Sequence, residues 1–165
     1  MAETTPEQPS TQNRLQMLSD FAALVRPGED FPLKDFTGRV DPASRSVGYD
    51  KGAMVFHLIR KKIGDRAFFA ALREVCRERL YREASWDDFI RAFSTKAGRD
   101  LAPFIRQWLD RPGGPRLALA NVARERKGGG WLVSGSVVQT PPFFALDVPL
   151  VVEAGGKTVR DLIKE

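Results

Sequence analysis

The chain has 165 residues, 42% of them hydrophobic, and a formal net charge of +5. This length and composition suffice for one ordinary domain or two small ones with a packed core, and they exclude a chain that is disordered throughout. One cysteine, Cys76, and one histidine, His57, cannot form an internal disulfide or the roughly four N or S ligands of a structural zinc site. Every apolar stretch is shorter than the roughly 20 residues of a membrane helix, so no membrane span is expected.

The positive charge is concentrated in residues 51–100, which hold 12 basic and seven acidic side chains. Acidic residues such as Glu74 and Glu78 alternate with the arginines at helical spacings, which is typical of a solvated helix face rather than of a nucleic-acid surface. The N-terminus has no basic stretch followed by an apolar one, so no secretory signal is expected and the sequence assigns no compartment.

Residues 1–12 are polar and aperiodic, which predicts a disordered tail. A first helix is predicted next, ended by Pro27-Gly28. Its apolar side chains recur at helical spacing and are expected to face the core: Leu15, Leu18, Ala22 and Val25. Residues 31–46 predict an irregular connection that Phe31 and Phe36 pin to the body of the protein.

Four further helical segments are predicted after the first one, and we expect residues 13–112 to form a helical subdomain that follows the tail. A mostly buried helix runs from Tyr49 to Ile63 and ends at Gly64, and Asp65 can cap the next one. Ser85 with Asp88 resembles a capping box that opens the following helix. Gly98 closes that helix, and Asp100 caps a short last one.

After Pro115 the apolar period changes from 3.6 to 2, so residues 115–165 predict a β subdomain. We expect this subdomain either to pack on the helices or to be truncated and to lack a partner. The glycines after Lys127 predict a hairpin turn, and a strand is predicted over 144–153. Helices followed by strands indicate an α+β protein, a helical bundle followed by a small antiparallel sheet or partial sandwich.

Several short stretches of the chain resemble stretches that occur in the same order in a known protein family. The stretch Val47-Gly48-Tyr49-Asp50-Lys51-Gly52-Ala53 resembles the Tyr-x-Lys-Gly helix start of the zinc aminopeptidases of the alanyl-aminopeptidase (gluzincin) family. Later pieces are similar to that family in order and spacing: Lys62 to Phe68, Ser85 to Phe89, Ala97 to Leu101, Gln107 to Pro115, and Val133 to Pro149 with Gln139 and Phe144. The resemblance spans roughly residues 15–155 and implies the end of the catalytic helical domain plus the start of the following β domain.

In such enzymes, the resemblance implies, zinc held by two histidines of His-Glu-x-x-His and a later Glu activates water for attack on a peptide carbonyl. Tyr49 then matches the tyrosine whose hydroxyl donates to the oxyanion, and the later helices wall the substrate pocket. A phenol, whose ordinary pKa is about 10, donates without carrying charge, and a helix start adds a favourable field. The alternative is that Tyr49 only anchors the preceding loop to the helix.

Other polar residues near Tyr49 are interpreted as structural. Lys51 is expected to face solvent or pair along the helix, Gly52 to permit a close backbone approach, and Asp50 to act as a helix charge. His57 is expected to be a buried or half-buried structural residue, and Cys76 a small core residue.

No His-Glu-x-x-His occurs, so the chain by itself is expected to bind no metal and to be inactive. Our leading hypothesis is a piece of a zinc aminopeptidase-like parent that acts on peptides and holds zinc elsewhere. The alternative hypothesis is a natural noncatalytic module that keeps the peptidase scaffold and binds a protein partner. Neither hypothesis involves a nucleic acid, and the sequence assigns no oligomeric state.

Overall fold

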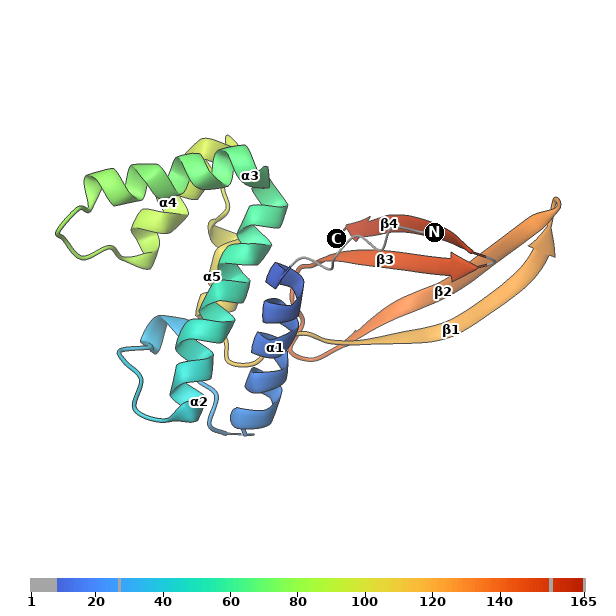
Figure 1. Cartoon of the computed structure of the whole chain (residues 1–165), viewed down its shortest axis with the longest axis horizontal. Coiled ribbons are helices and arrows are strands. Elements are labelled where there is room, and N and C mark those ends of the chain that lie inside the picture. The colour runs from blue at the N-terminus through green and yellow to red at the C-terminus, as the bar shows by residue number, and fades with distance from the viewer. Residues whose placement is uncertain (1–8, 27, 155, 165) are drawn as a thin grey trace. The chain divides into compact units, whose positions relative to one another are not determined.

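A computed structural model of the chain describes residues 9–26, 28–154 and 156–164. The chain divides into two compact units, residues 1–113 and 114–165. Helices fill the first unit and paired strands the second, as the blue-to-yellow and orange-to-red parts of Figure 1 show. The predicted α+β class is therefore confirmed. Among the described residues, no helix is both long and apolar enough to cross a bilayer.

The first helix, α1 (Pro9–Leu24), begins four residues before the predicted boundary of the tail. Residues 9–12 are thus helical, and the rest of that predicted tail lies outside the described residues. The prediction that Leu15 and Leu18 face the core is wrong, because Leu15 is 60% exposed and Leu18 is 51% exposed. Met17 and Phe21, also one helical turn apart, are half-buried instead.

The connection predicted over residues 31–46 contains short helices. A 3₁₀ turn, η1 (Leu33–Asp35), is followed by α2 (Pro42–Arg45), which a capping box of Asp41 and Ser44 opens. A π-helix, η2 (Ser46–Lys51), then leads without a break into α3 (Gly52–Glu78). The π-helix was not predicted, since its wider turn has no signature in the apolar pattern.

The predicted break at Gly64 is confirmed, because the non-helical backbone of this residue divides α3 into two helical segments that meet at a kink. Gly64 has φ 79° and ψ 161°, a conformation that glycine tolerates and other residues avoid, and α3 bends visibly in Figure 1. Both carboxylate oxygens of Asp65, the first residue after the kink, accept hydrogen bonds from Arg60, at 2.8 and 2.7 Å.

Two further helices complete the unit: α4 (Trp86–Ala97) and α5 (Ala102–Leu109). The predicted capping box is confirmed, since Ser85 accepts from the backbone of Asp88 while the Asp88 side chain accepts from the backbone of Ser85. Gly98 ends α4 in the left-handed conformation (φ 66°). Asp100 accepts from the N–H of Ala102 at 2.8 Å, as expected of a residue before the first turn.

The core between α3 and α4 is an aromatic cluster. Phe56 meets the rings of Phe68, Trp86, Phe89 and Phe93 at centroid distances of 5.4 to 6.4 Å. Such contacts bury large apolar area and also prefer defined ring angles, so they fix how the two helices pack.

Cys76 is exposed, and its predicted place in the core is wrong. Its neighbour Val75 is buried, as is Ala71 one turn earlier. Since successive residues of a helix point about 100° apart, Cys76 falls outside the buried face.

The second unit consists of two antiparallel hairpins. Strand β1 (Arg116–Lys127) pairs with β2 (Gly130–Thr140), and β3 (Asp147–Ala154) pairs with β4 (Lys157–Lys164). The predicted turn after Lys127 is confirmed, with positive φ at both Gly128 and Gly129. Alternate residues of β3 are half-buried and exposed, as the period of two predicts. The hairpins form separate two-stranded sheets rather than one.

Candidate functional site

Tyr49 lies on η2 and is 58% exposed. Four other residues of the same π-helix are buried: Ser46, Val47, Asp50 and Lys51. A π turn inserted in a helix is uncommon and is frequent at functional sites. The structure thus presents one phenol to solvent from a turn that is otherwise packed into the protein.

The backbone around Tyr49 is helical on both sides, which corrects one expectation. The helical run begins at Pro42 and continues through η2 into α3, so Tyr49 lies well inside it rather than at its start. The field of a helix terminus falls off within the first turn. It therefore adds little at the Tyr49 hydroxyl, and any donor role of this group rests on its exposure and placement.

Asp50 is held inside the turn. The hydroxyl of Ser46, a fully buried residue, donates to Asp50 Oδ2 at 2.8 Å, and Arg45 Nη1 lies 3.7 Å from the same oxygen. This network uses the carboxylate for structure, in agreement with its interpretation as a noncatalytic charge. It also fixes the backbone immediately after Tyr49.

Lys51 is buried, which agrees with its interpretation as a structural residue and excludes the solvent-facing alternative. Its Nζ donates to the carbonyl of Arg111 at 3.1 Å and lies 3.8 Å from Asp30 Oδ1. Asp30 in turn accepts a hydrogen bond from the N–H of Gly113. Burial lowers the pKa of Lys51, and the carboxylate of Asp30 opposes that shift. Lys51 therefore ties η2 to two segments that are distant in sequence.

Residues 30–36, which we call the strap, approach the helical run at Gly48 and Gly52. A Cβ at Gly48 would lie 2.3 Å from the ring of Phe36, whereas one at Gly52 would lie 3.9 Å from Leu33 Cδ1, an ordinary contact. The close backbone approach expected at Gly52 is not found there. The tight contact is at Gly48, which sequence reasoning passed over, and the group that approaches is the Phe36 side chain. The ring of Phe36 also meets Tyr49 edge to face, with centroids 5.6 Å apart and planes at 73°.

His57 is half-buried on α3, as expected. Burial is the largest cause that lowers its pKa, and the charges of Arg14, Lys61 and Arg60 act in the same direction. The imidazole is therefore held neutral at pH 7. No described contact brings it to Tyr49.

The donor set of this chain does not fit the zinc site that the resemblance implies. The sequence contains a single histidine and a single cysteine. Within the part of the chain that the structure describes, no three His, Cys, Asp or Glu side chains gather into a group that could hold a metal. Zinc in this region requires ligands from another polypeptide segment.

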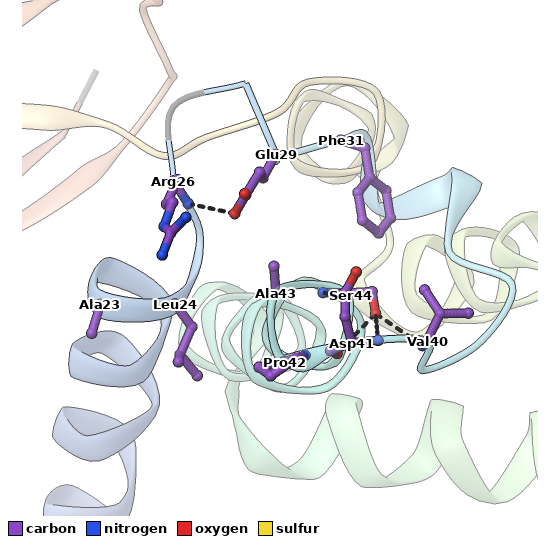
Figure 2. Close-up of a pocket in the computed structure, with 10 residues that line it drawn as sticks. All are labelled: Ala23, Leu24, Arg26, Glu29, Phe31, Val40, Asp41, Pro42, Ala43 and Ser44. Carbon is purple, nitrogen blue, oxygen red and sulfur yellow. Dashed lines mark hydrogen bonds between the residues drawn. The ribbon is translucent and has the colours of Figure 1, made fainter.

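A pocket of about 560 Å³ opens beside the C-terminal end of α1, as Figure 2 shows. Its lining comes from residues 23–44 and combines apolar groups with Arg26 and Glu29, whose carboxylate accepts from the N–H of Arg26 at 3.3 Å. Tyr49 is not among the lining residues, and neither are the helices after Ala53 that we expected to wall a pocket. The structure therefore does not bring the pocket and the phenol together.

Comparisons with known proteins point to peptidases. The chain is 31% identical over 70 residues to an aminopeptidase N of Lactococcus lactis, which covers 42% of this chain and 8% of that protein. It is 24% identical over 121 residues to a leucyl aminopeptidase of Saccharolobus solfataricus, a match that covers 71% of this chain and 15% of that protein. A probable M1 family aminopeptidase of Encephalitozoon cuniculi is 24% identical to the chain over 82 residues, which covers 50% of this chain and 10% of that protein.

No family model matches the chain. The chain spans between 8% and 15% of the length of these three relatives. The similarity is nevertheless shared by aminopeptidases from distant organisms, and it agrees with the resemblance noted from the motifs around Tyr49. The chain is thus similar to part of an aminopeptidase.

Proposed function

We propose that this chain supplies part of the active site of an aminopeptidase, with Tyr49 as the hydrogen-bond donor to the oxyanion that forms at the scissile carbonyl. The single observation that carries the proposal is the placement of Tyr49: its phenol is more than half exposed on a π turn whose other residues are packed and bonded. The similarity to aminopeptidases supports the choice of reaction.

A neutral hydroxyl suits this task because it donates a hydrogen bond without presenting a charge to the substrate before reaction. Donors act most strongly when they are held in place before the transition state forms, since no reorganisation is then needed. The two buried residues that follow Tyr49 meet that requirement: Asp50 is bonded to Ser46, and Lys51 to Arg111.

The zinc that the aminopeptidase resemblance implies belongs, in this proposal, to ligands outside this chain, because the residues present here do not fit it. The peptide substrate would be bound jointly with that other segment. The isolated chain is accordingly expected to hydrolyse no alanyl p-nitroanilide and to take up no stoichiometric zinc. Hydrolysis by the chain alone that a chelator abolishes would contradict this arrangement.

A second candidate function is a noncatalytic interaction module. It is favoured by the apolar side chains of Leu15 and Leu18 on α1, which are both more than half exposed. Exposed apolar groups on one helix face suit a protein partner. This candidate requires no role for the hydroxyl of Tyr49, which is how the two functions are told apart.

The deciding experiment is a chimera in which residues 13–112 replace the corresponding helical stretch of the Saccharolobus solfataricus leucyl aminopeptidase, whose similarity to this chain extends over 121 residues. We expect an active chimera in which Tyr49→Phe lowers kcat about 100-fold and changes KM little, because the lost donor acts in the transition state. Tyr81→Phe is the matched control, since Tyr81 is 98% exposed and has no proposed role. An active chimera in which Tyr49→Phe and Tyr81→Phe have equal kcat would favour the interaction module.

A further inference from the structure

We propose that Phe36 is a positioning residue for Tyr49: the strap holds its ring against Gly48, and the ring holds the phenol in its outward pose. This inference rests on the proposed function for its catalytic meaning, but its structural content stands on the contacts of the strap. It assigns a role to a residue about a dozen positions before Tyr49, outside the Tyr-x-Lys-Gly stretch.

The strap is fastened independently of Phe36. At its beginning Asp30 accepts from the N–H of Gly113 and lies 3.8 Å from the buried Lys51. In its middle Leu33 is 2% exposed and packs near Gly52. The strap therefore has a fixed path over the helix, and Phe36 reaches Gly48 as a consequence of that path.

The contact at Gly48 leaves the ring little freedom. A Cβ at this position would lie 2.3 to 2.5 Å from three carbons of the Phe36 ring, so the ring occupies the space that any other residue's side chain would fill. The backbone N–H of Phe36 donates to the carbonyl of Leu33 at 3.2 Å, which fixes the end of η1 from which the ring projects.

The contact with Tyr49 transmits this placement. An exposed tyrosine ordinarily exchanges among its rotamers, and a ring held edge to face at 5.6 Å favours one of them. A donor displaced by about 1 Å loses much of its effect on a transition state. The arrangement of Gly48, Phe36 and Tyr49 is thus suited to holding a hydroxyl that solvent alone would leave mobile.

The chain contains only two tyrosines, which permits a direct test on the whole 165-residue chain. Replacement of both by 3-fluorotyrosine gives two ¹⁹F resonances, assigned with Tyr81→Phe. Tyr81 is 98% exposed and serves as an internal reference, while the nearby ring of Phe36 displaces the resonance of Tyr49 from its unfolded position. We expect Phe36→Leu to move the Tyr49 resonance most of the way back to that position.

Gly48→Ala provides a second variant that leaves both rings intact. Its methyl group collides with the Phe36 ring, so the Tyr49 resonance should move as it does in Phe36→Leu. Gly52→Ala is the matched control: it lies one turn further on, its Cβ has an ordinary contact only, and it should leave the resonance in place. Because loss or displacement of the Phe36 ring moves the resonance by itself, the positioning role is read from the ¹⁹F transverse relaxation rate of Tyr49. This rate should fall toward that of the exposed Tyr81 in both variants and stay unchanged in Gly52→Ala.

The inference is overturned if the ¹⁹F relaxation rate of Tyr49 is unchanged in either folded variant, or if Gly52→Ala lowers it as far as Gly48→Ala does. In the active chimera we further expect Phe36→Leu to lower kcat about tenfold with little change in KM. A chimera in which Tyr49→Phe has no effect contradicts the proposed function, whereas the fluorine spectra decide the role of Phe36 in either case.

Discussion

Lys51 shows how burial changes the behaviour of one residue. Its ammonium group lies inside the helical unit, with the carbonyl of Arg111 and the carboxylate of Asp30 as partners. Removal of a charged donor from buried partners costs about 2 kcal/mol of the free energy of unfolding. We therefore expect Lys51→Met to destabilise the protein by about this amount at pH 7, as measured by urea denaturation.

The pH dependence of that difference has a definite sign. Burial lowers the pKa of Lys51 in the folded chain, whereas in the unfolded chain this pKa stays near 10.5. At pH values between the two, the unfolded chain holds a proton that the folded chain has released. The stability that Lys51 contributes to the wild type thus rises as the pH rises through the folded pKa toward 10.5. The gap in unfolding free energy between wild type and Lys51→Met should accordingly widen from pH 8 to pH 10.5.

Lys34→Met is the control for this series. Lys34 pairs with Asp110 at 3.0 Å, but both side chains are substantially exposed. An exposed ion pair of this kind contributes little to stability, because solvent screens its charges. Its removal should change the free energy of unfolding by less than about 1 kcal/mol at both pH 8 and pH 10.5. A gap that narrows with pH for Lys51→Met would show that the lysine is not buried as described.

At the scale of an element, α4 depends on its N-terminal cap. The hydroxyl of Ser85 accepts from the N–H of Asp88, and Asp88 bonds back to Ser85 while also pairing with Arg79 and Arg91. The backbone N–H of Ser85 is the largest cause that lowers the pKa of Asp88, followed by Arg79. The carboxylate of Asp88 thus takes part both in the helix cap and in the two ion pairs.

We expect Ser85→Ala to lower the free energy of unfolding by about 1 kcal/mol, because an unsatisfied N–H is left in the first turn of α4. Chemical denaturation followed by tryptophan fluorescence measures this loss. Thr95→Ala, an exposed position near the end of the same helix, should change the value by less than about 0.5 kcal/mol. Equal effects of the two variants would contradict the role of the cap.

The contribution of the ionised Asp88 carboxylate to the stability of the protein also depends on pH. Since its pKa is lowered in the folded protein, its contribution is present above the unfolded value of 3.8 and is lost as the pH falls through the folded value. Acid should therefore reduce the stability of the wild type more than that of Asp88→Asn.

At the scale of the whole molecule, the two units differ in how much core they contain. Among the described residues, the buried apolar side chains belong to residues 1–113 with one exception, Phe144. Gln139 brackets that residue, accepting from its N–H at 2.7 Å and donating to its carbonyl at 3.0 Å. A pair of two-stranded sheets with so little buried area is marginal as an independent unit.

This difference predicts the behaviour of the separated units. Residues 1–113 expressed alone should unfold cooperatively, with a Tm within about 4 °C of the main transition of the full chain. Residues 114–165 alone should show no cooperative transition by circular dichroism. A sharp transition in the second unit would contradict the assignment of the core to the helices.

The sequence by itself determined the features that depend on near neighbours along the chain. The α+β class, the cap of Ser85 and Asp88, the left-handed Gly98 and the glycine turn after Lys127 follow from local backbone preferences, and all are present. The motif stretch that contains Tyr49 also led to the aminopeptidases to which the chain is similar.

Only the tertiary structure decided which side chains are buried and what they touch. The exposed face of α1, the interior place of Lys51 and the contact of Phe36 with Gly48 all depend on segments distant in sequence. Helical spacing gives the angle between side chains but not the direction from which a partner packs. The exposure of Tyr49 and the strap that holds it are therefore consequences of the fold, not of the motif alone.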